Sequence, residues 1–169
     1  MAIRLALPVV ALSLAGLLGR AADCTSSSAT GGNPVDAAVP DGDLVGCATD
    51  PRDDTYAAGM MKPGTQGNFQ FVLMTANPGP PGLDANTWTV KLQDMGGAPV
   101  PGATFATIKP WMPDHGHGST ATPTVTDNGD GTYTVDDLYF FMAGLWQVPL
   151  TVQVNGKGDT VTFSFCVAG

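Results

Sequence analysis

The chain has 169 residues, and its 15 acidic residues against 7 basic ones give a formal net charge of −8. This acidic balance argues against nucleic acid and anionic lipid as partners. All the acidic residues are Asp, and the absence of Glu excludes the zinc-protease motif His-Glu-x-x-His. The sequence also has no nucleophile elbow, phosphate-binding glycine loop or haem-attachment motif, so we expect no enzymatic activity. The acidic pairs Asp53/Asp54 and Asp136/Asp137 are interpreted as surface charge.

Residues 1–23 have the features of a secretory signal peptide. Arg4 precedes an apolar run from Leu5 to Leu18, and Ala21 and Ala22 provide the small residues of a cleavage site. The run is shorter than the roughly 20 residues of a membrane-spanning helix, so a permanent transmembrane anchor is not expected. We therefore expect an exported protein, either periplasmic or associated with the outer membrane as a lipoprotein.

Cys24 stands where a bacterial lipoprotein carries its lipidated cysteine. Asp23 departs from the small-residue pattern of such signals, and cleavage after Ala21 or Ala22 is an equal alternative. Both a lipidated and a soluble product therefore stay open. Residues 24–46 are rich in Ser, Thr, Gly, Ala and Asp and contain few large apolar side chains, which predicts a flexible tether.

Residues 47–169 carry the pattern of an antiparallel β-sandwich preceded by an N-terminal docking segment. Short alternating apolar runs begin near Gly67, and turns rich in Pro, Gly, Asn and Asp separate them. The clearest runs are Phe69/Phe71/Leu73, Trp88/Val90/Leu92, Thr132–Val135, Trp146–Val154 and Val161–Val167. About seven such strands with regular turns predict an all-β, immunoglobulin-like fold.

The chain has three cysteines, an odd number for an exported protein. Oxidising compartments favour pairing, and if Cys24 is lipidated or stays in the tether, Cys47 and Cys166 are the partners that remain. Period-2 alternation places Cys166 on the other strand face from Phe165 and Val167, away from the main core. We therefore predict a disulfide that attaches the Cys47 segment to the outside of the last strand.

Both histidines fall within Trp111–Gly118, whose sequence is Trp-Met-Pro-Asp-His-Gly-His-Gly. Imidazole is the commonest side-chain ligand of transition metals, and thioether sulfur is a soft ligand. We predict a metal site built from His115 and His117, with Met112 and Met142 as second-tier ligands. Imidazole with thioether favours copper, particularly Cu(I), whereas imidazole with carboxylate suits Cu(II) or zinc.

Other side chains offer alternatives to this ligand set. Asp114 would supply a hard oxygen in place of sulfur. Met60 and Met61 are further thioether candidates, although methionines often fill irregular gaps in a core and packing is the favoured interpretation for both. Trp111 and Trp146 are expected to be core or rim aromatics.

Three segments together are similar to YtkA-like and FixH-like envelope domains: Met112–Gly118, Asp127–Val135 and Phe141–Trp146. In those domains a Met-Pro and His-Gly segment precedes a Gly-x-Tyr strand and a Met-Pro-Gly-x-Trp turn. The resemblance covers roughly residues 67–169, and Ala143 stands where the turn usually has proline. It implies an envelope β-sandwich associated with copper handling or oxidase assembly.

The sequence therefore predicts a periplasmic or lipid-anchored copper-binding protein that delivers, buffers or senses copper. Its candidate partners are the metal ion and a copper-receiving envelope protein. The competing interpretation is a metal-free immunoglobulin-like interaction module, in which Trp111 and the histidines form a contact loop. Convergence of both imidazoles and a methionine sulfur on one point would favour copper.

Overall fold

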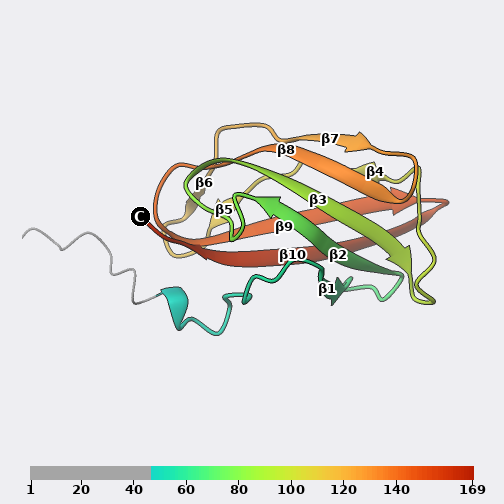
Figure 1. The fold of residues 1–169 in the computed structure, drawn as a ribbon, viewed down its shortest axis with the longest axis horizontal. Coiled ribbons are helices and arrows are strands. Elements are labelled where there is room, and N and C mark those ends of the chain that lie inside the picture. The colour runs from blue at the N-terminus through green and yellow to red at the C-terminus, as the bar shows by residue number, and fades with distance from the viewer. Residues whose placement is uncertain (1–46) are drawn as a thin grey trace, which may run out of the picture. The chain divides into compact units, whose positions relative to one another are not determined.

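Two antiparallel sheets form over residues 47–169, which are the residues described by the computed structural model (Figure 1). The first sheet has the order β1-β2-β3-β8-β7, with bounds β1 (Met60–Pro63), β2 (Phe69–Asn77), β3 (Asp84–Asp94), β8 (Thr132–Phe140) and β7 (Thr124–Asp127). The second has the order β10-β9-β5-β6, with bounds β10 (Lys157–Val167), β9 (Gly144–Val154), β5 (Trp111–Met112) and β6 (His117–Gly118). The predicted signal peptide, the tether and Cys24 lie outside the described residues.

The strand order confirms the predicted immunoglobulin-like sandwich. The order β2-β3-β8-β7 reproduces the four-stranded sheet of that fold, and β10 and β9 form the other sheet together with an interrupted third strand. That third strand consists of β4 (Thr104–Phe105) and β5, which both pair with β9, at Thr104↔Gln153 and Trp111↔Gln147. Residues 47–169 form ten strands rather than about seven, and three of these strands have only two residues.

The core lies between the sheets and is built from the predicted alternating residues. Trp88 of β3 is fully buried, and its ring meets Phe163 and Phe165 of β10 edge-on, at centroid distances of 6.1 and 5.6 Å. Edge-to-face contacts of this kind add to the burial of apolar area. Trp146 of β9 is also fully buried, in agreement with its expected core position. The two sheets are therefore joined by aromatic packing.

The segment before β1 covers the outer edge of β10, where an unpaired strand would expose backbone groups. Asp54 N–H donates to the Ser164 carbonyl at 2.7 Å, and the Asp54 carboxylate accepts from Ser164 N–H at 2.8 Å. The Asp53 carboxylate accepts from Cys166 N–H at 2.8 Å. The interpretation of Asp53/Asp54 as plain surface charge is therefore wrong, because both carboxylates satisfy donors of an edge strand.

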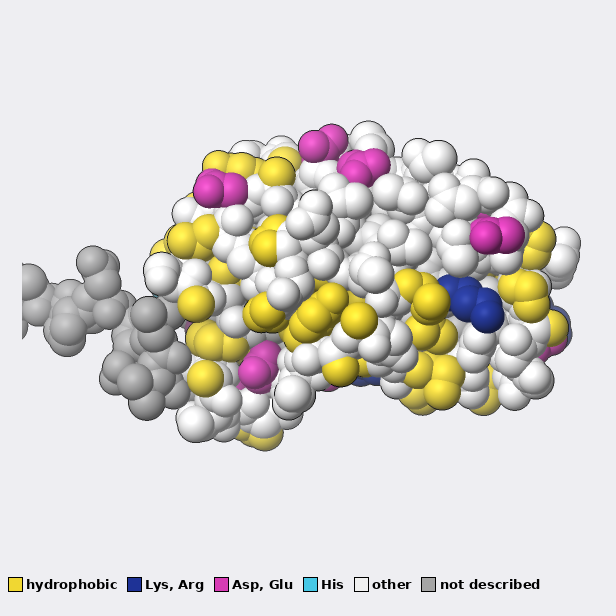
Figure 2. All heavy atoms as spheres, viewed as in Figure 1, with side chains coloured by type: hydrophobic (Ala, Val, Ile, Leu, Met, Phe, Trp, Pro, Cys, Tyr) yellow, Lys and Arg dark blue, Asp and Glu magenta, His cyan; other side chains and the backbone are white. Residues whose placement is uncertain are grey.

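The negative charge of the domain is dispersed on the face that Figure 2 shows. Acidic side chains are scattered over that face, two of them side by side at the top, without forming one large patch, and a basic side chain lies among apolar ones. Over residues 47–169, no helix has the length and apolar character needed to cross a bilayer.

Candidate metal site

The two histidines lie on a tight hairpin made by β5 and β6. Met112 pairs with His117 across the hairpin, and Trp111 pairs with Gly118. The loop is closed by N–H groups of His115 and Gly116, which donate to the Met112 carbonyl at 3.3 and 3.0 Å. Gly116 has a φ of 68°, which glycine adopts without steric cost. This turn brings both ends of the His-rich segment together.

The cross-strand pairing puts Met112 and His117 on one face of the hairpin. Side chains directly opposite in an antiparallel pair have Cβ atoms about 5 Å apart. Met112 is fully buried, whereas His117 is half-buried and His115 is exposed. The two imidazole rings are 5.5 Å apart between centroids. The three side chains therefore run from the core to the surface, with Met112 buried, His117 half-buried and His115 exposed.

Gly144, the first residue of β9, lies directly against this group. A Cβ built on Gly144 would be 2.7 Å from the Met112 methyl carbon and 3.8 Å from Nε2 of His115. The Met112 methyl group and Nε2 of His115 thus both lie beside Gly144, and a side chain at residue 144 would collide with Met112. Gly144 also has a φ of 132°, which disfavours other residues.

His117 has a buried ring nitrogen without a protein partner. Its Nδ1 is inaccessible to solvent and makes no hydrogen bond. The ring stacks on Phe141, with centroids 5.4 Å apart and an interplanar angle of 28°. Buried polar atoms without partners are rare and costly, because they lose hydration without compensation. A bound metal ion is one partner that would compensate an imidazole nitrogen.

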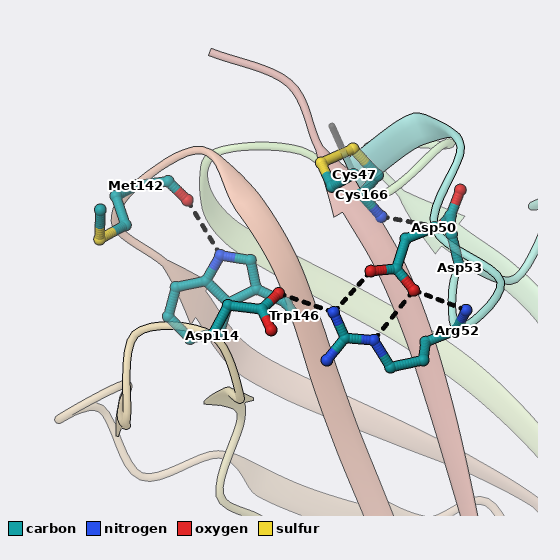
Figure 3. Close-up of a disulfide and its surroundings, with 8 residues drawn as sticks. All are labelled: Cys47, Asp50, Arg52, Asp53, Asp114, Met142, Trp146 and Cys166. Atoms are coloured by element: carbon teal, nitrogen blue, oxygen red, sulfur yellow. Dashed lines mark hydrogen bonds and ion pairs between the residues drawn. A yellow bond between two sulfur atoms is a disulfide. The ribbon is translucent and has the colours of Figure 1, made fainter. Parts of the chain in front are cut away.

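Met142 lies in the turn just before Gly144. Its carbonyl accepts a hydrogen bond from Nε1 of Trp146 at 2.9 Å, and its half-buried side chain packs against the core (Figure 3). Its sulfur lies on the side away from the Trp146 ring. The turn that carries Met142 adjoins the hairpin, because Phe141 stacks on His117 and Gly144 lies against Met112.

Comparison with known proteins adds the family. A model of the YtkA-like family matches residues 65–151. The chain belongs to the YtkA-like family. Neither the search of curated proteins nor the search of solved structures gave a match. The family assignment made from the hairpin, the β7–β8 segment and the turn before β9 is thus confirmed.

The residues matched to the YtkA-like family include the whole hairpin and Gly144. All four predicted ligands, Met112, His115, His117 and Met142, therefore lie within the family domain. The two disulfide cysteines lie outside it, one on each side.

The other two methionine candidates do not belong to this site. Met60 and Met61 lie in β1, which pairs with β2 in the opposite sheet. Met60 packs against the core, and the Met61 sulfur accepts from Nε2 of Gln93 at 3.4 Å. Their interpretation as packing residues holds for Met60, whereas Met61 is an exposed rim residue.

The candidate donors of this site are limited to histidine and methionine side chains. Within residues 47–169, no group of three or more His, Cys or Asp side chains is placed to hold a metal ion. Asp114 is exposed and points to Arg52, whose Nη2 donates to it at 2.8 Å. The Asp114 carboxylate is thus engaged by Arg52, whereas Met112 lies opposite His117 in the hairpin.

The disulfide between Cys47 and Cys166 is present, as predicted (Figure 3). Its Cα atoms are 5.4 Å apart, and both cysteines are half-buried while the neighbouring Phe165 and Val167 are buried. It attaches the N-terminal segment to the outside of β10. β10 pairs with β9 through Val167↔Gly144, so this attachment lies at the same end of the sandwich as the hairpin (Figure 1).

Three residues that contact the site were missed by sequence reasoning. Gly144 and Phe141 belong to the Phe141–Trp146 turn on which the family resemblance partly rests. That resemblance could have indicated both residues as neighbours of the histidines. Arg52 is 62 residues from Asp114, and no local pattern marks it.

Proposed function

We propose that this YtkA-like protein binds copper in the bacterial cell envelope, without enzymatic activity, and that it delivers, buffers or senses the ion. The observation that carries the proposal is that the Met112 methyl group and Nε2 of His115 both lie beside Gly144, with His117 paired across the hairpin from Met112. The unpartnered Nδ1 of His117 supports it. The apparent sequence features of export, including Cys24, agree with an envelope location.

The donor set favours Cu(I) over harder ions. Two imidazoles and one thioether suit a soft monovalent ion, whereas Cu(II) and zinc prefer sites that add carboxylate or further nitrogen ligands. Met142 is the candidate for a fourth donor, since its turn adjoins Gly144. His115, which is exposed, would receive the ion at the surface and allow transfer to a partner.

The test is a competition titration with Cu(I) and with Cu(II) on the 47–169 domain and on the full chain. We expect one Cu(I) per chain and a loss of affinity of at least about tenfold in the His115→Ala/His117→Ala variant. Met61→Leu is the matched control, because this methionine lies in the other sheet, and it should bind like the wild type. Equal binding by the wild type and the double-histidine variant would refute the proposal.

The second candidate function is a metal-free interaction module. The exposed fractions of Trp111 and Phe141 are 44% and 45%, and both residues adjoin the histidines. Exposed aromatics on loops of a rigid scaffold commonly make partner contacts. If the wild-type domain binds neither copper ion in the titration, this function becomes the better account.

A further inference from the structure

Arg52 connects the N-terminal segment to the loop that carries His115. Its Nη2 donates to Oδ2 of Asp114 at 2.8 Å, across 62 residues of sequence. The same guanidinium is held by Asp50, whose Oδ1 accepts from Nε of Arg52 at 2.9 Å and from its backbone N–H at 2.8 Å (Figure 3). A planar guanidinium fixed in this way gives directed hydrogen bonds to a second carboxylate.

The position of Arg52 is determined independently of the loop. Asp50 N–H donates to the Cys47 carbonyl at 3.1 Å, and Asp53 N–H donates to the Asp50 carbonyl at 2.9 Å. The Cys47–Cys166 disulfide and the hydrogen bond from Cys166 N–H to Asp53 attach this turn to β10. The hydrogen bonds from Arg52 also lower the pKa of Asp50 to about 2, so the pair stays charged at neutral pH. Arg52 is therefore already in place to bind Asp114.

Asp114 is the one hard donor within the His-rich loop. It directly precedes His115 and is two residues after Met112, so a free carboxylate at this position is within reach of an ion held by His115. A carboxylate would add a hard, negative ligand, which favours Cu(II) and zinc over Cu(I). The bond to Arg52 occupies this carboxylate and places a positive charge beside it. A divalent ion is repelled by that charge twice as strongly as a monovalent one.

We propose that Arg52 sets the metal selectivity of the site, by holding Asp114 away from the ion and so favouring Cu(I) over Cu(II). This inference rests on the proposed copper function. Arg52 acts through Asp114 and is a positioning residue, so its effect is on the ratio of the two affinities.

The experiment measures association constants for Cu(I) and Cu(II) separately, on the full chain, for four proteins: wild type, Arg52→Ala, Arg52→Ala/Asp114→Asn and Lys157→Ala. Lys157→Ala is the matched control, since it removes the same charge from an exposed residue at the opposite end of β9 from Gly144. We expect the ratio of Cu(II) to Cu(I) affinity to rise about threefold to tenfold in Arg52→Ala. This variant loses the exposed ion pair with Asp114, and the freed carboxylate becomes an additional ligand for Cu(II). The double variant should return to the wild-type ratio, and Lys157→Ala should match it.

The outcomes separate this inference from the proposed function. An equal ratio in Arg52→Ala and Lys157→Ala, with copper still bound, would overturn the role of Arg52 alone. A raised ratio that persists in the double variant would show that Asp114 is not the group released, and would overturn it as well. Absence of copper binding by the wild type would refute the proposed function itself. Thermal unfolding of each variant confirms that it is folded, which is expected because Arg52 is exposed.

Discussion

Met112 combines a packing role in the core with a proposed role as a metal ligand. It is fully buried within the hydrophobic core, and its methyl carbon lies beside Gly144, which Nε2 of His115 also approaches. Packing alone would account for burial, since methionine fills irregular gaps. Met112 also pairs with His117 across the hairpin, which places it next to a candidate ligand. Ligation through the Met112 sulfur can therefore be tested separately from packing.

Substitution Met112→Leu separates these roles, because leucine keeps the volume and removes the sulfur. We expect the Cu(I) affinity to fall about tenfold or more, while the free energy of unfolding changes by less than about 1.5 kcal/mol. Competition titration and chemical denaturation measure the two quantities. Met60→Leu, in the opposite sheet, is the control for a methionine that packs against the core. An unchanged Cu(I) affinity in Met112→Leu would remove sulfur from the ligand set.

Asp159 is a second residue whose environment determines its chemistry. It is 2% exposed, and its carboxylate accepts hydrogen bonds from the backbone N–H groups of Gln66, Asn68, Phe69 and Thr160, at 2.8 to 2.9 Å. Burial by itself raises the pKa of Asp159, but these four donors outweigh it and the net pKa lies below its usual value. The ionised carboxylate of β10 thus holds the loop before β2.

The lowered pKa of Asp159 predicts a pH dependence of stability. The contribution of this carboxylate to the free energy of unfolding is fully present above its unfolded-state pKa of about 4. It is lost as the pH falls through the lower folded-state pKa. In Asp159→Asn we expect a loss of about 2 to 3 kcal/mol at neutral pH, because an amide nitrogen then faces backbone donors. Denaturation curves between pH 2 and about 7 measure both effects. If the free energy of unfolding of Asp159→Asn falls at low pH as much as that of the wild type, Asp159 is not the source of the acid dependence.

Among the strands, the long ones could be predicted from sequence and the short ones could not. β3, β9 and β10 show clear period-2 alternation, and their turns carry Asn-Gly and similar signals. Strands of two residues, such as β5 and β6, have no period to detect. They exist because β9 supplies a pairing partner for β5, and β5 in turn pairs with β6. Tertiary context rather than local pattern creates the hairpin.

The N-terminal segment was predicted only in part. The disulfide could be inferred from the number of cysteines and from the face on which Cys166 lies. Nothing in the sequence indicated that Asp53 and Asp54 bond to β10, since adjacent carboxylates are usually surface charge. In the candidate site, too, only residues close in sequence could be predicted. The histidines and Met112 are neighbours in the chain, whereas Arg52 is distant and was missed.

The disulfide is the element that fixes this segment, and its removal has a predictable cost. Cys47 and Cys166 are 119 residues apart, so the bond closes a long loop in the unfolded chain. We expect Cys47→Ser/Cys166→Ser to lose about 4 to 5 kcal/mol of unfolding free energy on the chain-entropy estimate. Urea denaturation of this variant beside the oxidised and reduced wild type measures the loss. Equal stability of oxidised and reduced wild-type protein would contradict a structural role for the bond.

At the scale of the whole molecule, the sandwich serves as a rigid support for a site at one end. The aromatic core joins the two sheets, and the hairpin lies at the end where β9 begins and β10 finishes. Because the proposed ligands come from the hairpin and from the turn before β9, a bound ion would add a connection to the β5–β9 pairing that already joins these segments. Metal binding should therefore be coupled to the stability of the fold.

This coupling predicts that Cu(I) raises the unfolding temperature. Binding to the folded state alone stabilises it by about 2.7 kcal/mol when free ligand is a hundredfold above its dissociation constant. For a domain of this size, that corresponds to an increase of several degrees. Thermal unfolding with and without Cu(I) measures it, and His115→Ala/His117→Ala should show no increase. A similar increase in the double variant would place the ion elsewhere.

The most direct test of the central claim is X-ray absorption spectroscopy at the copper edge of the Cu(I)-loaded protein. It identifies the atoms that bind the ion, which affinity alone does not. We predict nitrogen scattering from two imidazoles together with sulfur scattering, and a weaker sulfur contribution in Met112→Leu. A wild-type spectrum with no sulfur contribution, or one that His115→Ala/His117→Ala leaves unchanged, would contradict a copper site formed by Met112, His115 and His117.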